Sequence, residues 1–290
     1  MDIVYILEEI YERIHYIFHL HRGDVITVSY SGGKDSTLML VLISKFLIEK
    51  GGEFRSTPVY FIHSDTGVEI PEIRSFPVKI LKKTENILRL YGLNAYTKVV
   101  GPEPRDNFFI KMLVDGYPMP HLRFRWCSRV LKTKPIDKFI RELRAIHNGK
   151  RIVKIIGVRA EESRDRRSKI GVYETFFHEV KKRETPIYAP IYTLTSNQVW
   201  RILKEVVDTT FIWTENDCYD LKNIYGKNLK IRHGCWVCPL ISLRKGDKAL
   251  RELARHLRKP YLLKLEEIKI DLIKISCNKE NRVIDKHTGK

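Results

Sequence analysis

The segment Ser-Gly-Gly-Lys-Asp-Ser at residues 31–36 has the composition of a loop that binds phosphate. It follows Asp24–Tyr30, a short run rich in β-branched residues that predicts a buried strand, and it precedes Thr37–Leu47, which predicts a helix. The glycines let the backbone approach an anion closely, and the first N–H groups of the helix can donate to it. Lys34 adds a full positive charge. Because the spacing is neither that of a Walker A loop nor that of a dinucleotide-binding turn, we expect a pyrophosphate site of another kind.

The cysteines form a second group of residues that could do chemistry. Cys235-Trp236-Val237-Cys238 is a C-x-x-C pair, and Cys127, Cys218 and Cys277 complete the set of five. With no export signal, this number indicates a reducing cytoplasm, where clustered cysteines bind metal or catalyse more readily than they form disulfides. Thiolates suit zinc as well as an iron–sulfur cluster, and the C-x-x-C pair also suits a redox dithiol. The alternative without chemistry is packing as small hydrophobic side chains, which is our expectation for Cys277.

Strands and helices must alternate to position these residues. Helices are expected at 3–20, 37–47, 71–90, 134–146 and 195–206, with Gly51-Gly52 ending the second; strands are expected at 24–30, 58–63, 94–100 and 151–156. This alternation predicts an α/β fold with a mainly parallel sheet and flanking helices. After about residue 158 the pattern loosens into a charged loop at 159–167 and short strands at 172–193. We expect an N-terminal helix at 1–22, a nucleotide-binding domain at 23–207 and a smaller cysteine-rich basic region at 208–290.

Composition and charge limit the classes of protein. The chain has 290 residues, of which 43% are hydrophobic, so disorder throughout, collagen-like repetition and a small disulfide scaffold are excluded. No apolar run approaches the length of a membrane span, and the first residues lack the pattern of a signal peptide, so we expect a cytoplasmic protein without a membrane partner. The formal net charge of +18 favours a polyanionic partner such as nucleic acid; the alternative is a generally charged, solvated surface.

The loop at 31–36 resembles the SGGxDS loop of the PP-loop ATP pyrophosphatases, which have the adenine-nucleotide alpha-hydrolase-like fold. In that superfamily the loop holds the β- and γ-phosphates of ATP while an oxygen attacks the α-phosphorus, which forms an adenylate and releases pyrophosphate. The resemblance implies ATP and Mg²⁺ as cofactors. It assigns catalysis to Lys34, Asp35 and Arg159, and nucleotide binding to Ser29, Ser31, Gly32, Gly33, Lys34, Asp35, Ser36, Asp65, Gly157, Arg159 and Arg164.

Further segments at 63–72, 125–135, 157–164 and 190–200 resemble, in order, those of the PAPS reductase-like branch. That branch includes APS and PAPS reductases, the small sulfate adenylyltransferase subunit and the DndC proteins of DNA phosphorothioation. Asp65 would follow the second strand at the carboxyl edge of the sheet, where ligands of open α/β sheets sit.

The arginines of the 157–167 segment suit phosphate oxygens because guanidinium groups donate two parallel hydrogen bonds. We expect Arg159 and Arg164 to hold substrate phosphates. The alternative is a solvated loop in which these arginines pair with Glu161 and Glu162.

The tract from Cys218 to Cys238 resembles the cysteine tract of DndC proteins, a family that carries four cysteines and an iron–sulfur cluster. The resemblance implies that Cys127, Cys218, Cys235 and Cys238 bind one 4Fe–4S cluster, with Zn²⁺ as the alternative. The chain has no ECG-x-H motif, which supplies the nucleophilic cysteine of APS and PAPS reductases, so the reductase interpretation lacks its nucleophile.

These observations favour a PP-loop ATP pyrophosphatase that adenylates an oxygen of a nucleic acid for cluster-assisted sulfur incorporation, with a DNA backbone phosphate favoured over tRNA. A cysteine desulfurase or another sulfur donor would be a partner. The alternatives are an APS/PAPS reductase of sulfate assimilation, a tRNA thiolation enzyme, and a non-catalytic nucleotide-binding regulatory subunit. Basic residues that could follow the nucleic-acid backbone lie in the 222–258 stretch: Lys222, Lys227, Lys230, Arg232, Arg244, Lys245, Arg251, Arg255 and Arg258.

Overall fold

The computed structural model describes residues 3–121, 123–162, 185–207, 212–226, 234–240 and 247–281. The chain forms two compact units, each assembled from separate stretches of sequence. The first, here the sheet unit, comprises residues 1–63, 75–99 and 139–221; the second, here the cysteine unit, comprises residues 64–74, 100–138 and 222–290.

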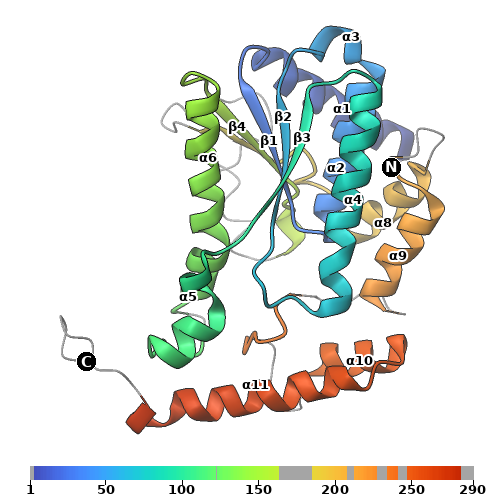
Figure 1. Ribbon diagram of the computed structural model, residues 1–290. Helices are drawn as coiled ribbons and strands as arrows, with labels where there is room; N and C mark the ends of the chain where they lie inside the picture. Colours follow the sequence, from blue (N-terminus) through green and yellow to red (C-terminus); the bar gives the residue numbers. More distant parts are fainter. Residues whose placement is uncertain are drawn as a thin grey trace. The chain divides into compact units, whose positions relative to one another are not determined.

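A five-stranded parallel sheet forms the core of the sheet unit (Figure 1). Its strands are β1 (Val25–Tyr30), β2 (Val59–Ser64), β3 (Ala95–Val100), β4 (Ile152–Ile156) and β5 (Ile187–Tyr188), in the order β3-β2-β1-β4-β5. Strand order reverses beside β1, because β2 lies on one side of it and β4 on the other. The loops after β1 and β4 therefore diverge at the carboxyl edge, which is where open α/β sheets bind ligands. The predicted α/β class and parallel sheet are confirmed.

Helices cover both faces of this sheet. Figure 1 shows α6 (Lys134–Ile146) on one face and α2 (Lys34–Glu49) with α4 (Pro71–Leu90) on the other. Helix α1 (Ile3–Leu20) packs on α2 and on α8 (Ser196–Glu205) through a buried stripe of isoleucines at spacings of three and four residues. Because both faces are covered, β1 and most of α2 are buried along nearly their whole length.

Most predicted helix boundaries agree with the structure. Helices α4 and α6 begin and end at the predicted residues. Of the two candidate caps of α8 in the sequence, Thr195 and Ser196, the structure has Thr195, through a reciprocal bond with Gln198. The second helix, α2, ends at Glu49, just before Gly51-Gly52, as the sequence predicts. Gly51–Phe54 then forms a separate short helix, α3, whose Phe54 packs against buried aromatic rings of α1 and α2.

Strands were also predicted at 172–193. The described part of that range contains β5, and residues 172–184 lie outside the described residues.

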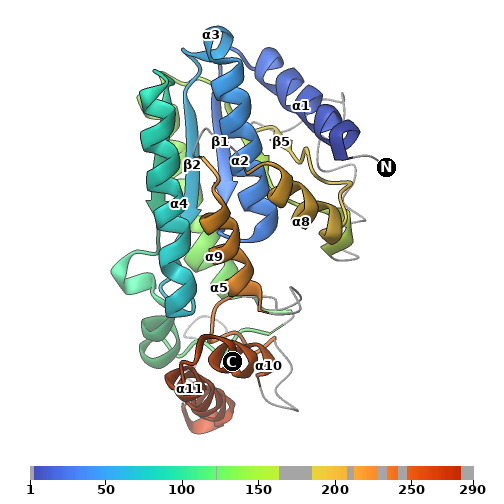
Figure 2. The same ribbon diagram turned by 90° about the vertical axis from the view of Figure 1, so that its right-hand side faces the viewer.

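The cysteine unit is mostly helical in its described part. It contains α5 (Trp126–Ser128), α10 (Lys248–Leu257) and α11 (Tyr261–Cys277), and α10 and α11 lie side by side (Figure 2). Helix α9 (Glu215–Tyr225) contributes residues to both units. The main core of the cysteine unit consists of Val68, Phe108, Met112, Met119, Trp126, Leu131, Val237 and Leu272.

Helix α11 also carries a buried ion pair. Lys269, which is fully buried, donates to the buried carboxylate of Asp247 over 2.7 Å, and Glu266 accepts from the backbone N–H of Asp247. The segment 262–275, for which the sequence leaves open a packing helix or a partner surface, is thus a helix that packs along one side.

Among the described helices, none combines the length and hydropathy that a membrane span requires.

Candidate functional site

The phosphate-type loop connects β1 to α2 and is closed by its own serines. The hydroxyl of Ser36 lies 2.9 Å from that of Ser31, accepts from the Ser31 backbone N–H and donates to the Gly33 carbonyl. Gly32 has φ +76, and a Cβ there would lie 2.3 Å from Cγ of Pro77, so only glycine fits. No side chain caps α2 at Gly33, which leaves the positive end of the helix dipole facing the loop.

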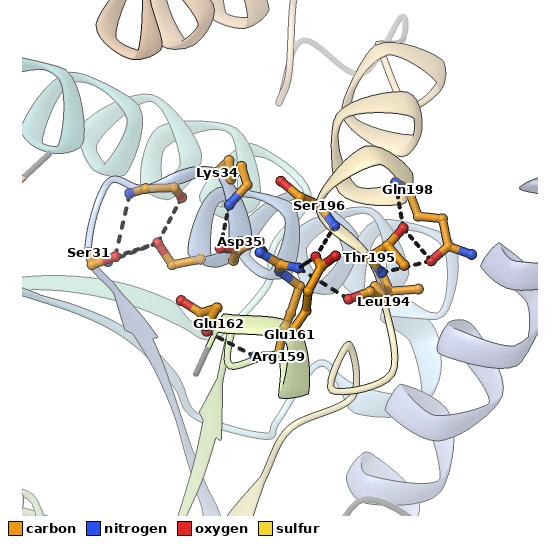
Figure 3. A network of polar contacts seen from close by, with 12 residues as sticks. Ser31, Lys34, Asp35, Arg159, Glu161, Glu162, Leu194, Thr195, Ser196 and Gln198 are labelled. Carbon is orange, nitrogen blue, oxygen red and sulfur yellow. Dashed lines mark hydrogen bonds and ion pairs between the residues drawn. The ribbon is translucent and has the colours of Figure 1, made fainter. Parts of the chain in front are cut away.

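Lys34, Asp35 and Arg159, the three residues predicted to be catalytic, form one buried network (Figure 3). One oxygen of Asp35 accepts from Lys34 Nζ over 3.0 Å, and the other accepts from Arg159 Nε over 2.5 Å. Asp35 therefore bridges two cations, and its negative charge is compensated from both sides.

Arg159 is only 3% exposed, and protein groups hold its guanidinium. Its Nη1 donates to Glu161 over 2.7 Å and to the Leu194 carbonyl over 3.2 Å, besides the Nε bond to Asp35. Arg159 does pair with Glu161, as the alternative expected, but it is buried, so the solvated loop of that alternative is wrong for this residue. In this arrangement Arg159 is placed to orient Asp35, a role that the sequence reasoning did not assign.

Glu161 extends the network to α8. Its carboxylate accepts from the backbone N–H of Ser196 over 2.6 Å as well as from Arg159. The hydrogen bond from Arg159 and then that from Ser196 lower the pKa of Glu161. Figure 3 shows these side chains converging from the start of α2, the loop after β4 and the start of α8. The acidic residue two positions after Arg159 was the signal in the sequence from which the pairing of Glu161 with Arg159 could have been predicted.

Two further predicted residues lie on the strands next to the loop. Gly157 directly follows β4, and a Cβ there would lie 2.7 Å from the Asp35 carbonyl oxygen and 2.8 Å from Ser36 Cα. The end of β4 thus packs directly on the first turn of α2. Ser29 is half-buried in β1, in register with Ile62 and Ile156. Arg164 lies outside the described residues.

Asp65 belongs to the cysteine unit, where it is held by Arg74. Its carboxylate accepts from Arg74 Nη2 over 2.7 Å and Nε over 2.9 Å, and from the Gly67 N–H over 2.9 Å. Burial is the largest single influence and raises the pKa of Asp65, but the bonds from Arg74 and Gly67 together outweigh it, so the pKa lies below its ordinary value.

The segment after Asp65 pairs with the C-x-x-C segment. The Trp236 N–H donates to the Val68 carbonyl over 2.9 Å, and Glu69 forms an antiparallel bridge with Cys235. The Thr66 hydroxyl donates to Glu69 over 2.5 Å and lies 3.5 Å from Cys235 Sγ. The segment after Asp65 and the C-x-x-C segment, which lie far apart in the sequence, therefore pair with each other in the structure.

Three of the four predicted cluster ligands, Cys127, Cys235 and Cys238, belong to the cysteine unit. Burial raises the pKa of the Cys127 thiol, and the charges of Cys235 and Cys238 raise it further, so the three sulfurs interact electrostatically. Burial likewise raises the pKa of Cys235. The fourth ligand, Cys218, is buried on α9 in the sheet unit, and Cys277 is exposed.

We tested whether these thiols fit a metal group. All five cysteines are free, and the donor set of Cys127, Cys235 and Cys238 has the chemistry of a cluster or zinc site. Within the described residues, however, no three His, Cys, Asp or Glu side chains are arranged to hold a metal ion. The three thiols therefore have the chemistry that a cluster requires and belong to the same unit, but within the described residues they do not form a complete set of ligands.

Positive charge is concentrated in the cysteine unit. Its stretches of sequence hold 27 Lys and Arg against 14 Asp and Glu, a net charge of +13, whereas the larger sheet unit has a net charge of +5. In the predicted basic stretch, Arg251, Arg255 and Arg258 are exposed and Lys222 is half-buried. Outside the described residues lie Lys227, Lys230, Arg232, Arg244 and Lys245.

Comparison with known families and sequences gives one family and two relatives. Residues 25–240 match the phosphoadenosine phosphosulfate reductase domain family. The uncharacterized protein MJ0066 of Methanocaldococcus jannaschii is 29% identical over 230 residues, which is 79% of this chain and 39% of MJ0066. MJ0973 of the same organism is 26% identical over 220 residues, 76% of this chain and 42% of its own length. The chain thus spans about two-fifths of the length of these relatives.

Three solved structures illustrate the similarity of fold at low identity. A phosphoadenylyl-sulfate reductase of Candida auris has a TM-score of 0.38 and 15% identity, covering 62% of this chain and 71% of its own. The U34-tRNA thiolase NcsA of Methanococcus maripaludis, solved with its [4Fe-4S] cluster, has a TM-score of 0.40 and 12% identity, covering 87% and 73%. A NAD⁺ synthetase of Burkholderia pseudomallei has a TM-score of 0.41 and 15% identity, covering 97% and 90%.

Proposed function

Because the chain belongs to the phosphoadenosine phosphosulfate reductase domain family, we propose that it is a PP-loop enzyme that cleaves ATP to AMP and pyrophosphate. The acceptor of the adenylyl group is an oxygen of a nucleic acid, with a DNA backbone phosphate favoured over tRNA. The observation that carries the proposal is the glycine loop at the point where strand order reverses, with Lys34 held by Asp35 and Asp35 held by Arg159. A cationic, preorganised loop of this kind stabilises charge that develops on a leaving pyrophosphate.

The network gives each residue a distinct role. The acceptor oxygen forms a bond to the α-phosphorus, and the bond from the α-phosphorus to pyrophosphate breaks. Lys34 and the amides at the start of α2 stabilise the departing charge. Arg159 pairs with Glu161 as well as with Asp35, and Asp35 fixes the direction of the Lys34 side chain. Because both oxygens of Asp35 accept from Lys34 and Arg159, Mg²⁺ would be held through the phosphates of ATP.

The cysteine unit supports sulfur incorporation as the purpose of adenylation. Adenylation turns the acceptor oxygen into a leaving group. Sulfide-level sulfur then bonds to the acceptor as AMP departs with that oxygen; a persulfide on a cysteine desulfurase or another donor would supply this sulfur only with a thiol that reduces its S–S bond. Cys127, Cys235 and Cys238, with Cys218, would hold a 4Fe–4S cluster or, alternatively, Zn²⁺. Such a cluster would supply an iron site for sulfur, whereas zinc would stabilise the fold.

The experiment that tests this function is turnover by protein purified without oxygen. With ATP, Mg²⁺, DNA or tRNA, and sulfide as the nucleophile that displaces AMP, we expect AMP and pyrophosphate in equal amounts, at a rate that the preferred nucleic acid raises. Formation of ADP, or no ATP cleavage with either acceptor, would contradict the proposal. Iron and zinc are counted on the same sample, with Cys235→Ser as the variant and the exposed Cys277→Ser as its matched control.

A reductase of APS or PAPS is the second candidate, and the family match favours it. It predicts thioredoxin-dependent release of sulfite without cleavage of ATP. The exposed Cys277, at the end of α11, is followed by Asn278 and Lys279 and lacks the Gly and His of the reductase motif. Sulfite release that survives Cys277→Ser and stops without Cys235 would require a different nucleophile from that of the known reductases.

A further inference from the structure

A short loop at 118–126 in the cysteine unit is fixed at both ends. The Trp126 indole N–H donates to the Pro118 carbonyl over 2.8 Å, and the Trp126 ring stacks on buried Phe108 with centroids 5.3 Å apart. The Met119 N–H donates to the Ser276 hydroxyl of α11 over 2.7 Å. These contacts tie the two ends of the loop to the core of the unit, on either side of Leu122, which lies outside the described residues.

The tip of this loop is a turn that exposes an aromatic ring. His121 and Phe124 exchange backbone hydrogen bonds of 3.3 and 3.0 Å, and their rings lie 6.1 Å apart. Phe124 is 43% exposed, and the flanking Arg123 and Arg125 are exposed as well. Burial does not account for this phenylalanine, because its neighbours Phe108 and Trp126 fill the core without it.

In the described part of the chain, the arginines next to Phe124 in sequence have no polar partner. The side chains of Arg123, Arg125 and Arg129 make no hydrogen bond or ion pair there. Other arginines of the same unit differ: Arg74 is bound to Asp65 and Arg251 to Glu266. Arg123 and Arg125 flank the exposed Phe124 in sequence and Arg129 follows five residues after it, so this part of a unit of net charge +13 favours an anionic ligand.

We propose that Arg123, Phe124, Arg125 and Arg129, here the arginine–phenylalanine surface, bind single-stranded nucleic acid. One unpaired base stacks on Phe124, and the guanidinium groups hold the phosphates on either side. Stacking needs a base whose face is free, which a duplex does not offer, so the ligand is a single strand, a loop or a flipped nucleotide. The inference rests on the proposed function, since it names how the nucleic-acid acceptor is held beside Cys127, which follows Trp126 in sequence.

The test is fluorescence anisotropy of the full chain with labelled oligonucleotides of about 12 nucleotides. Single-stranded DNA, single-stranded RNA and blunt duplex DNA are compared between about 50 and 200 mM salt. Phe124→Ala should weaken single-strand binding about 5- to 150-fold, the loss of one stacked base, and Phe124→Trp should retain it. Arg123→Ala with Arg125→Ala should reduce the slope of log affinity against log salt by about 1.4.

The matched control is Lys264→Ala with Lys274→Ala. Both lysines are exposed on α11 of the same unit and pair with Glu267 and Asp271, so the variant removes the same charge from another surface. The proposal is overturned if this control weakens binding as much as the arginine variant, or if Phe124→Ala binds like the parent chain. It is also overturned if the duplex shows the same dependence on Phe124, or if poly-glutamate displaces the oligonucleotide more strongly than unlabelled strand, which would indicate a protein partner.

ATP turnover in the same samples separates this inference from the proposed function. If binding depends on Phe124 but no nucleic acid raises AMP formation, the surface stands and adenylation of a nucleic acid fails. If nucleic acid raises AMP formation equally in the parent chain and in Phe124→Ala, the function stands and the surface is wrong. The relative affinities for DNA and RNA strands then identify the acceptor class.

Discussion

Gly157→Ala tests whether the end of β4 sets the position of the phosphate loop. A Cβ at Gly157 would lie 2.7 Å from the Asp35 carbonyl oxygen, 2.8 Å from Ser36 Cα and 2.9 Å from the Asp35 carbonyl carbon. Ordinary contact begins at 3.4 Å, and all three neighbours are backbone atoms that cannot rotate away. The first turn of α2 must therefore move by about half an ångström or more, at the overpacking cost of about 1–3 kcal/mol.

A movement of the first turn of α2 affects ligand binding because Asp35 belongs to that turn. A shift of this backbone changes the 2.5 Å bond to Arg159 and the 3.0 Å bond that orients Lys34. Since about 1.4 kcal/mol corresponds to a factor of ten, we expect the affinity for ATP–Mg²⁺ to fall about tenfold or more. Calorimetric titration with ATP measures the affinity, and urea unfolding measures the loss of stability.

Gly52→Ala is the matched control. Gly52 lies in α3, where an added Cβ meets nothing within 4 Å, so the substitution should leave ATP affinity unchanged and raise stability by up to about 1 kcal/mol. Gly157→Ala with unchanged ATP affinity and unchanged unfolding would show that the loop is positioned independently of β4, and the network described above would lose its structural basis.

Two predictions concern buried charges, and urea unfolding measures both. Lys269→Met leaves Asp247 buried without its partner and should lower the free energy of unfolding by about 3–5 kcal/mol. The control Lys274→Met, on the exposed side of α11, should lower it by less than about 1 kcal/mol. Equal losses in the two variants would refute the argument from burial. For Asp217, burial raises the pKa, but the bonds from Lys83 and Thr214 outweigh it, so the pKa lies below its ordinary value. The ion pair with Lys83 therefore stabilises the fold above the ordinary carboxyl pKa and is lost as pH falls through the lowered value. The stability gap between the parent chain and Asp217→Asn should stay constant above about pH 5 and shrink progressively as the pH falls from there towards about pH 2, and a constant gap would contradict this origin.

The local parts of the fold were predictable because periodicity and capping depend on neighbouring residues. The bounds of α4 and α6 and the Thr195 cap follow from such patterns. The end of α2 just before Gly51-Gly52 follows from the same kind of pattern, whereas the short helix at Gly51–Phe54 does not, because it depends on burial of Phe54 against other aromatic rings.

The nonlocal parts of the candidate site could not be predicted. Thr66 and Cys235 are 169 residues apart, and no pattern in either segment names the other as its partner. Arg159 illustrates the same limit: its place on a phosphate-binding motif predicts contact with a ligand, whereas its bonds to Asp35, Glu161 and Leu194 depend on three separate segments. The sequence thus identified Lys34, Asp35 and Arg159 as one group, and only the tertiary structure shows which groups each of them contacts.

The interleaving of the two units has a consequence for biosynthesis. The sheet unit ends at residue 221, so all of its residues are translated before the C-x-x-C pair. The core of the cysteine unit joins Val68 to Leu272, so early segments wait for late ones and this core cannot close before Leu272 has been translated. Any metal or cluster that binds Cys235 and Cys238 would therefore be enclosed by this core only after every residue of the sheet unit has been translated.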